Sequence, residues 1–304
     1  MKVFVTGVAG QLGHDVMNEL AKRDYEGIGS DIAPEYSGIA DGSAVTRMPY
    51  VSMDITKKDL VEAVIKEYAP DVVVHCAAWT AVDMAEEDDK IKTVYAINVL
   101  GTENIVRACK EQDCKMVYLS TDYVFNGNGS EPWFPDCRDF MPLNVYGKTK
   151  LEGEWAVSKN LDKYFIVRIA WVFGLNGKNF IKTMLDIGRK REEIRVVNDQ
   201  IGTPTYTFDL ARLLVDMIET DKYGYYHATN EGGYISWYDF ACEIFRQSGY
   251  TTKVIPVSTK EYGQSKAARP FNSRMDKRKL TENGFALLPS WQDALARYLK
   301  EIEY

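Results

Sequence analysis

The sequence predicts an α/β protein built around a doubly wound parallel sheet. A glycine turn stands between a short apolar stretch at residues 2–6 and a helical pattern at 14–22. Nearly continuous apolar stretches at 71–78 and 115–120 are typical of parallel strands covered on both faces. Such stretches alternate with helical patterns up to residue 173. This alternation favours parallel strands joined by right-handed helical crossovers.

The composition is ordinary for a globular chain of 304 residues, with 45% hydrophobic and 27% charged residues. A net charge of −7 leaves no basic face for nucleic acid. Five scattered cysteines and three histidines form no zinc-like pattern, so we expect no metal site built on them. The chain runs from Met1 directly into a strand and has no stretch near the ~18 apolar residues that span a membrane. We therefore expect a cytoplasmic protein with no membrane segment.

The glycine turn carries the first functional prediction. Its glycines allow a tight turn and a close approach of the backbone to a pyrophosphate, which binds at the N-terminus of the following helix. A purely structural turn is the weaker interpretation, because a strand precedes the turn and a helix follows it. We expect a Rossmann-type dinucleotide site that includes Gly7, Gly10, Gln11, Leu12 and Gly13.

The next predicted strand, 26–30, ends at Asp31. An acid about 20 residues past the glycines can bind the adenosine ribose hydroxyls and would repel a 2′-phosphate, which favours NADH. The loop 33–49 carries Arg47, which could approach a 2′-phosphate. The choice between NADH and NADPH therefore stays open.

Further along, a helix is expected at 57–68 and another at 95–109, and each precedes one of the apolar strands. The strand 115–120 delivers Thr121 and Asp122 to its carboxyl end, where open parallel sheets bind ligands. The acidic stretch 86–89 is interpreted as a solvated face near a helix N-terminus.

Tyr146 and Lys150 lie four residues apart in a helix predicted at 145–158, so they share one helical face. A phenol with a pKa of about 10 is a poor acid at neutral pH, and a nearby cation would lower that pKa. Alone, such a pair more often lies on the exposed face of a helix without a catalytic role. After a dinucleotide turn and a strand ending in Thr121, it is interpreted as a tuned proton donor.

The C-terminal part of the chain is less regular. A strand is expected at 164–173, and later elements are expected at 179–191, 194–197, 208–220, 224–228, 236–249 and 291–303. We assign residues 1–173 and 204–229 to the dinucleotide domain. Residues 174–203 and 230–304 are assigned to a smaller interleaved substrate domain that forms the other wall of a cleft.

Several motifs together resemble one family over essentially the whole chain. They are Gly10-Gln-Leu-Gly13, Ala78-Trp-Thr-Ala-Val-Asp83, Ser120-Thr-Asp-Tyr-Val-Phe125, Pro142 to Lys150, Ala170-Trp-Val-Phe173, Asn198 to Pro204 and Arg269 to Arg274. This set is similar to the dTDP-4-dehydrorhamnose reductases, which are extended short-chain dehydrogenase/reductases. The motifs are weak singly and specific together.

The resemblance implies NADH- or NADPH-dependent reduction of the C4 keto group of dTDP-4-dehydro-L-rhamnose to dTDP-L-rhamnose. It implies Tyr146 as proton donor, Lys150 as its partner that also holds the nicotinamide ribose, and Thr121 as a hydroxyl that tunes the site. The remaining implied positions are Asp54, Ile55, Ala78, Trp79 and Thr80 for the dinucleotide, and Thr121, Asp122 and Trp171 for the sugar. Arg269 and Arg274 either pair with the substrate pyrophosphate or form structural ion pairs.

The resemblance also suggests a homodimer. Some family members bind magnesium at a dimer interface, but no acidic motif of this sequence matches such a site. Three other interpretations are weighed. Related dehydratases carry Thr-Asp-Glu where this chain has Thr121-Asp122-Tyr123, which argues against dehydration. Epimerases use the same catalytic residues and are disfavoured only by the whole motif set. A non-catalytic regulatory subunit like that of methionine adenosyltransferase is disfavoured by the intact catalytic set.

Overall fold

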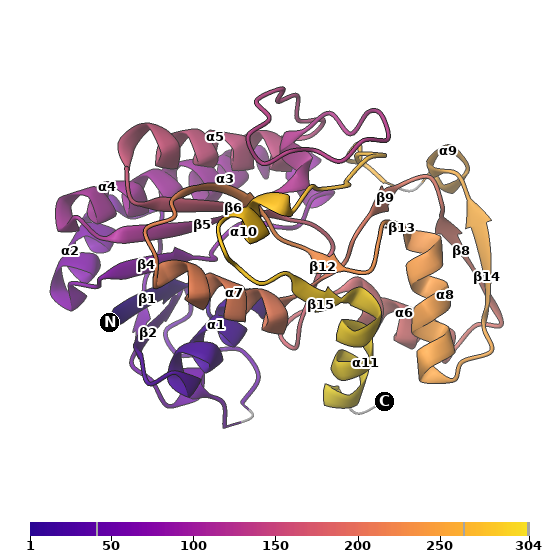
Figure 1. Ribbon diagram of the computed structural model, residues 1–304, viewed down its shortest axis with the longest axis horizontal. Helices are drawn as coiled ribbons and strands as arrows, with labels where there is room; N and C mark the ends of the chain where they lie inside the picture. The colour runs from indigo at the N-terminus through magenta and orange to yellow at the C-terminus, as the bar shows by residue number, and fades with distance from the viewer. Residues whose placement is uncertain (41, 264, 303–304) are drawn as a thin grey trace.

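A seven-stranded sheet forms the centre of the molecule in the computed structural model, which describes residues 1–40, 42–263 and 265–302 (Figure 1). The strand order is β11-β6-β5-β4-β1-β2-β3, and every neighbouring pair is parallel. The order reverses between β1 and β4, as in a doubly wound sheet, so the predicted fold class is confirmed. The strands are β1 (Lys2–Thr6), β2 (Glu26–Asp31), β3 (Tyr50–Ser52), β4 (Val72–His75), β5 (Lys115–Thr121), β6 (Tyr164–Ile169) and β11 (Gly224–His227).

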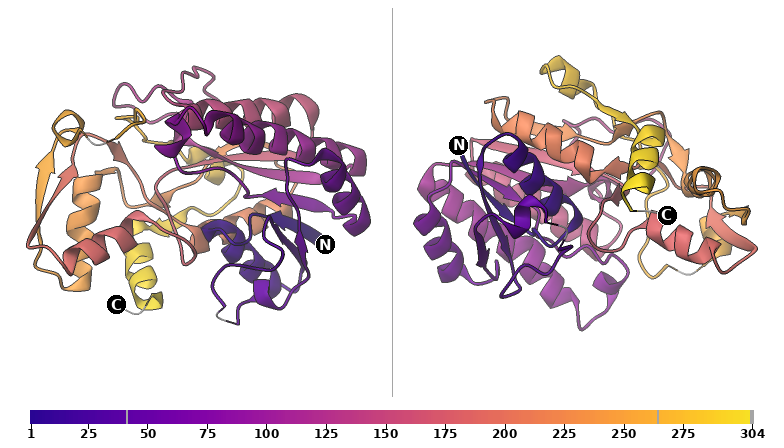
Figure 2. Two further views of the ribbon diagram at one scale, coloured as in Figure 1. Left: turned by 180° about the vertical axis from the view of Figure 1, so that it is seen from behind. Right: turned by 90° about the horizontal axis from the view of Figure 1, so that it is seen from below.

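Helices cover both faces of the sheet (Figures 1 and 2). Val3 and Val5 of β1 belong to the apolar core on the side of α1 (Gln11–Lys22) and α7 (Thr207–Ile218). Phe4 belongs to the core on the other side, because successive side chains of a strand point to opposite faces. That side is covered by α2 (Lys58–Tyr68), α4 (Thr102–Gln112) and α5 (Val145–Asn160). Short helical pieces are η1 (Ala44–Thr46), η2 (Met84–Glu86), α3 (Ile91–Tyr95), η3 (Ala96–Gly101) and η4 (Asp122–Val124).

A third apolar core lies among elements at one end of the sheet (Figure 1). Three helices contribute to it: α6 (Phe180–Gly188), α8 (Trp237–Ser248) and α11 (Trp291–Glu301). Short strands pair around them, namely β7 (Val172–Phe173) with β10 (Thr205–Tyr206), β8 (Glu193–Val197) with β14 (Lys253–Val257), β9 (Ile201–Gly202) with β13 (Ile235–Ser236), and β12 (Asn230–Glu231) with β15 (Leu288–Ser290). The remaining helices are α9 (Thr259–Tyr262) and α10 (Arg278–Glu282). Within the described ranges, no helix is long and apolar enough to cross a membrane.

Three predicted elements differ from the structure. The strand expected at 164–173 is wrong as one unit: β6 ends at Ile169, and β7 leaves the main sheet to pair with β10. The break lies at Trp171, whose φ of 51° no strand accommodates. The helix expected at 95–109 is divided into α3, a π-helical turn in η3, and α4.

The helix expected at 291–303 ends at Glu301 as α11, and residue 303 lies outside the described part of the chain. The sequence analysis did not predict β14. β14 contains Pro256, and among the described residues it pairs with β8 alone, so the proline falls at an edge where it is tolerated.

Candidate active site

A cavity of about 660 Å³ opens at the carboxyl ends of the central strands. It is the place where a doubly wound sheet binds its ligands. All but one of the residues assigned above to catalysis, the dinucleotide or the sugar line it. They are Gly7, Gly10, Gln11, Leu12, Gly13, Asp31, Asp54, Ile55, Ala78, Thr80, Thr121, Asp122, Tyr146, Lys150 and Trp171. The exception is Trp79.

The glycine turn is shaped by backbone that leaves no room for side chains. Gly7 has a φ of 72°, and a Cβ there would lie 2.6 Å from the backbone nitrogen of Ala77. A Cβ on Gly13 would overlap the carbonyl oxygen of Gly7 and lie 2.8 Å from the Cα of Val8. Gly10 caps α1 without a side-chain hydrogen bond. The first N–H groups of α1 therefore remain available to a phosphate.

Asp31 lies at the end of β2, beside the glycine turn. Its Oδ2 accepts a hydrogen bond from Ala9 N at 2.9 Å, and its Oδ1 accepts one from Ile32 N at 2.8 Å. The carboxylate thus joins the end of β2 to the glycine turn. Arg47 is exposed and does not line the cavity.

Lys178 does line the cavity, and the sequence analysis missed it. It lies in the loop between β7 and α6, where Asn179 Nδ2 donates to Gln11 Oε1 at 3.1 Å. Lys182 Nζ donates to the carbonyl oxygens of Leu175 and Gly177 in the same loop. No motif indicated Lys178, because only the tertiary fold brings this loop to the glycine turn.

Trp79 does not line the cavity, whereas its neighbours Ala78 and Thr80 do. The backbone N–H of Trp79 donates to Asn98 Oδ1 at 2.8 Å, and Asn98 Nδ2 donates to Thr149 Oγ1 of α5 at 3.1 Å. Asn98 lies in the π-helical turn of η3, and such turns often accompany functional sites. This asparagine ties the loop after β4 to the helix that carries Tyr146.

Tyr146 and Lys150 lie in the first two turns of α5, whose start is fixed by Asn144: its Oδ1 accepts from Gly147 N at 2.8 Å. Burial raises the pKa of Tyr146, and a hydrogen bond with the Thr121 hydroxyl acts in the opposite direction. The expectation that a cation lowers this pKa is wrong for the cavity as it stands, because burial outweighs the other effects. The phenol is therefore protonated at neutral pH.

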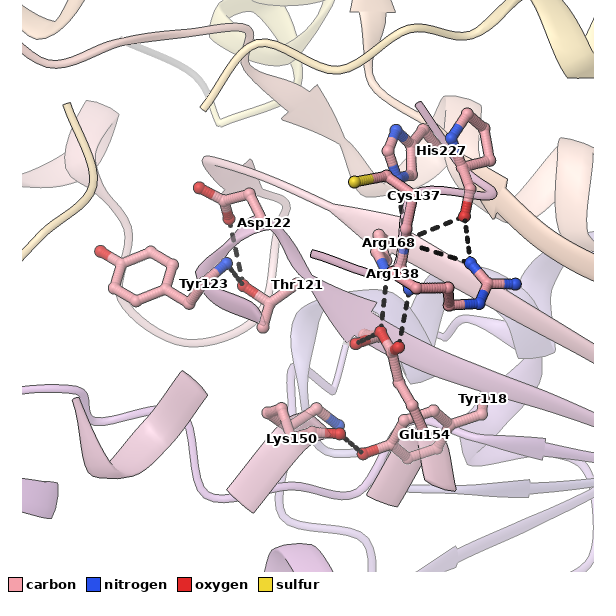
Figure 3. Close-up of polar contacts among 12 residues, drawn as sticks. Tyr118, Thr121, Asp122, Tyr123, Cys137, Arg138, Lys150, Glu154, Arg168 and His227 are labelled. Carbon is pink, nitrogen blue, oxygen red and sulfur yellow. Dashed lines mark hydrogen bonds and ion pairs between the residues drawn. The ribbon is translucent and has the colours of Figure 1, made fainter. Parts of the chain in front are cut away.

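Lys150 is buried, and burial lowers its pKa to about 7. Its Nζ lies 4.1 Å from the centre of the Tyr118 ring, and the Tyr118 hydroxyl donates to the Lys150 carbonyl oxygen at 3.1 Å. The charge of Glu154, one turn further along α5, raises the Lys150 pKa and opposes the effect of burial. Figure 3 shows Lys150, Tyr118 and Glu154 next to one another.

Glu154 belongs to a buried polar network that sequence reasoning missed (Figure 3). Arg168 Nε and Nη2 each donate to its carboxylate at 2.8 Å. Ser120 Oγ donates to the same carboxylate at 2.5 Å, and Arg168 Nη1 lies 3.3 Å from His227 Nε2. The network joins α5 to β5, β6 and β11. The carboxylate of Glu154 and the guanidinium of Arg168 are paired with each other, so neither buried charge lies alone in an apolar environment.

Thr121 and Asp122 lie side by side where β5 ends (Figure 3). Thr121 Oγ1 donates to Asp122 Oδ1 at 3.1 Å. Burial raises the pKa of Asp122 to about 6, and hydrogen bonds from Ser273 and Thr121 partly oppose this rise. Its Oδ2 is buried and has no hydrogen-bond partner among the described residues. A buried acceptor of this kind suits a hydroxyl donor on a ligand.

Trp171 has the left-handed backbone conformation, which costs a bulky residue on the order of 1–3 kcal/mol. The chain around it is held by Thr205, whose N–H donates to the Trp171 carbonyl oxygen at 3.1 Å and whose Oγ1 donates to the Ala170 carbonyl oxygen at 2.6 Å. The strain persists because β10 fixes this bend.

The two predicted arginines form internal contacts. Arg269 binds both carboxylate oxygens of Asp83, at 3.1 and 2.7 Å. Arg274 Nη1 donates to Asn272 Oδ1 at 3.0 Å. Of the acidic stretch 86–89, Glu86 Oε1 accepts from Val145 N at 2.7 Å, at the start of α5. Across the described residues there is no group of three or more His, Cys, Asp or Glu side chains placed to hold a metal ion.

Comparison with known proteins assigns the family. The family model described as "RmlD substrate binding domain" matches residues 1–304. A dTDP-4-dehydrorhamnose reductase from Escherichia coli is 35% identical over 99% of this chain and 98% of its own length. The spore coat polysaccharide biosynthesis protein SpsK of Bacillus subtilis is 37% identical over 99% of this chain and 97% of its own length.

Solved structures agree. The dTDP-4-dehydrorhamnose reductase of Bacillus anthracis in complex with NADP has a TM-score of 0.86 and 38% identity over 99% of each chain. A UDP-glucose 4-epimerase of Thermus thermophilus reaches a TM-score of 0.80 at 20% identity, so it shares the fold alone. The match along the entire chain and the relatives above 30% identity place this protein in the dTDP-4-dehydrorhamnose reductase family of oxidoreductases.

Proposed function

We propose that this chain reduces the C4 keto group of dTDP-4-dehydro-L-rhamnose to dTDP-L-rhamnose, with NADPH or NADH as reductant and Tyr146 as proton donor. One observation carries the proposal: a single cavity joins a glycine turn at one end to Tyr146, Thr121 and Trp171 at the other. The names of the relatives above and the NADP complex of one solved structure support it.

The residues at the dinucleotide end fit a pyridine dinucleotide. The backbone of the glycine turn and the start of α1 would hold the pyrophosphate, Asp31 would face the adenosine ribose, and Lys150 would hold the nicotinamide ribose. The bound nicotinamide supplies hydride to C4 of the sugar. Lys178 lines the cavity and would meet a phosphate of the dinucleotide. This cation favours use of NADPH beside the acidic Asp31.

Tyr146 and Thr121 act at the carbonyl oxygen, where negative charge develops. Because burial keeps the pKa of Tyr146 high, the phenol carries its proton at neutral pH and donates it to this oxygen. The Thr121 hydroxyl, which donates to Asp122 Oδ1 in this structure, would turn to donate to the same oxygen when the sugar binds. Lys150, charged below a pKa of about 7, stabilises the phenolate that remains until a proton returns from solvent.

Asp122 and Trp171 hold the sugar. The unpartnered Oδ2 of Asp122 accepts a sugar hydroxyl, and the Trp171 indole packs against the apolar side of the ring and its 6-methyl group. Residues 174–203 and 230–304 form the substrate unit in this proposal, with residues 1–173 and 204–229 as the dinucleotide unit. Arg269 already pairs with Asp83, so we assign it no contact with the pyrophosphate of the substrate.

A second candidate substrate follows from one relative. A dTDP-4-keto-6-deoxy-D-glucose reductase of Streptomyces niveus is 36% identical over 81% of this chain and 78% of its own length. The two substrates differ in ring stereochemistry, and both carry a keto group at C4 and a methyl group at C6. The same chemistry at Tyr146 therefore serves both.

The test supplies each keto sugar, generated in situ, with NADPH or NADH, and follows both nucleotide absorbance and the sugar product. We expect nucleotide consumption and dTDP-L-rhamnose from the rhamnose precursor. Consumption with the glucose-derived sugar alone would favour the second substrate. Conversion between epimers without net nucleotide consumption would indicate an epimerase. Tight nucleotide binding without turnover of either sugar would indicate a regulatory subunit.

A further inference from the structure

The Trp171 indole is held by two neighbours. The Trp237 ring lies nearly parallel to it, with ring centres 3.7 Å apart and planes 15° apart. On Gly202, an added Cβ would lie 2.9 Å from Cε2 and 3.1 Å from Cζ2 of the Trp171 ring. The backbone of Gly202 therefore already contacts the indole. Between these two contacts the ring has little room to turn.

Both neighbours come from one pair of short strands. β9 and β13 are antiparallel, with Gly202 opposite Ile235 and Ile201 opposite Ser236. Trp237 follows β13 directly and begins α8, whose start is fixed by a capping box between Ser236 and Asp239. The ladder thus sets the place of Gly202 and Trp237 together.

The same ladder reaches the second sugar-side residue. The Ile201 carbonyl oxygen accepts from Ser273 N at 2.8 Å, and, against the larger rise caused by burial, the Ser273 side chain lowers the pKa of the Asp122 carboxyl. Neither Gly202 nor Trp237 lines the cavity. Both act on it indirectly: Trp237 through Trp171, and Gly202 through Trp171 and through Ser273, whose Cβ would lie 3.1 Å from a Cβ added at position 202.

We propose that Gly202 and Trp237 are positioning residues that fix the Trp171 indole as the apolar wall for the sugar methyl group. This inference rests on the proposed function, because it needs a 6-deoxy sugar at this end of the cavity. A side chain at position 202 would displace the indole, and loss of the Trp237 ring would free it to rotate. Either change removes a preorganised contact, which weakens sugar binding more than it slows the chemistry.

The test compares Gly202→Ala and Trp237→Leu with the native chain. We expect each to raise KM for the dTDP-keto sugar about tenfold, the lower end of the effect of one misplaced apolar contact, with kcat little changed. The Kd for NADPH should stay at its native value, because the glycine turn is untouched. Trp237→Phe keeps an aromatic ring over Trp171 and should restore most of the native KM.

Trp291→Leu is the matched control. Trp237 and Trp291 each follow a serine cap and begin a helix, and both rings contact Phe240, with ring centres 6.4 and 5.8 Å apart. Trp291→Leu should lower the melting temperature and leave KM unchanged. The proposal is overturned if Gly202→Ala and Trp237→Leu keep the native KM, or if Trp291→Leu raises KM as much as they do.

A spectroscopic measurement needs no substrate. Two indoles stacked at 3.7 Å give an exciton signal in circular dichroism, which Trp237→Phe should abolish, Gly202→Ala should alter, and Trp291→Leu should leave in place. A chain that keeps these signals but reduces neither keto sugar contradicts the proposed function and not the placement of Trp171. A native spectrum without the signal, or one that Gly202→Ala leaves unaltered, contradicts the positioning role.

Discussion

The two ends of the cavity are built in different ways. The dinucleotide end consists mainly of backbone from consecutive elements, β1, the glycine turn, α1 and β2, and its shape depends on glycines that leave no space for a Cβ. The sugar end consists of side chains from segments far apart in the chain, including Asp122, Tyr146 and Trp171. Changes at the first end should therefore disturb nucleotide binding as a whole, and changes at the second should act on the sugar alone.

The largest effect is expected from Gly13→Ala. The new Cβ would overlap the Gly7 carbonyl oxygen, so α1 and the turn must separate. We expect a loss of about 10²-fold in kcat/KM for NADPH, as for a misplacement of about 1 Å. Gly129→Ala is the control, because its Cβ meets nothing within 4 Å; its φ of 80° is left-handed, unlike that of Gly13, so the alanine itself is more strained there. Equal kinetics for the two variants would show that the turn does not shape the nucleotide site.

At the sugar end, Asp122→Asn should raise KM for the keto sugar about tenfold and leave the Kd for NADPH unchanged, because a buried carboxylate acceptor is replaced by a neutral amide. The pH dependence of kcat/KM in the native protein tests the same carboxylate. The raised pKa of about 6 means that the carboxylate is lost as the pH falls through about 6, so kcat/KM for the sugar should fall there. If kcat/KM of the Asp122→Asn variant still falls in the same pH range, a group other than Asp122 is responsible for the fall.

A smaller effect is expected from Lys178→Gln at the nucleotide end. Removing this cation should raise the Kd for NADPH by about fivefold, the upper range for an exposed charge contact. Fluorescence titration with NADPH and NADH distinguishes whether Lys178 contacts the 2′-phosphate or the pyrophosphate. A change for NADPH alone places Lys178 at the 2′-phosphate, and an equal change for both places it at the pyrophosphate. Lys190→Gln, an exposed lysine outside the cavity, should change neither.

The smallest effect is expected from Asp31→Asn. It removes the charge that would repel a 2′-phosphate and keeps one of the two acceptor oxygens that bind Ala9 N and Ile32 N. The ratio of kcat/KM for NADPH to that for NADH should rise about threefold, the scale of an exposed charge interaction. An unchanged ratio would mean that Asp31 only joins β2 to the glycine turn.

The same contrast explains what the sequence could predict. The main sheet and the glycine turn follow from local patterns, because most strands are short apolar stretches and most crossovers contain a helical pattern. The bend at Trp171 escaped prediction, since the apolar letters continue through it and only the pairing of β7 with β10 breaks the strand. Lys178, Glu154 and Trp237 also escaped, because their importance depends on contacts between segments that no local pattern records.

The central claim is that Tyr146 donates the proton in a reduction carried out inside this cavity. The most direct test is Tyr146→Phe with NADPH and the dTDP-4-dehydro-L-rhamnose precursor, with NADPH binding measured on the same sample. We expect binding to persist and reduction to fall by about 10²–10⁴-fold, the contribution of a positioned acid. Native turnover by this variant, or loss of NADPH binding together with activity, would contradict the account.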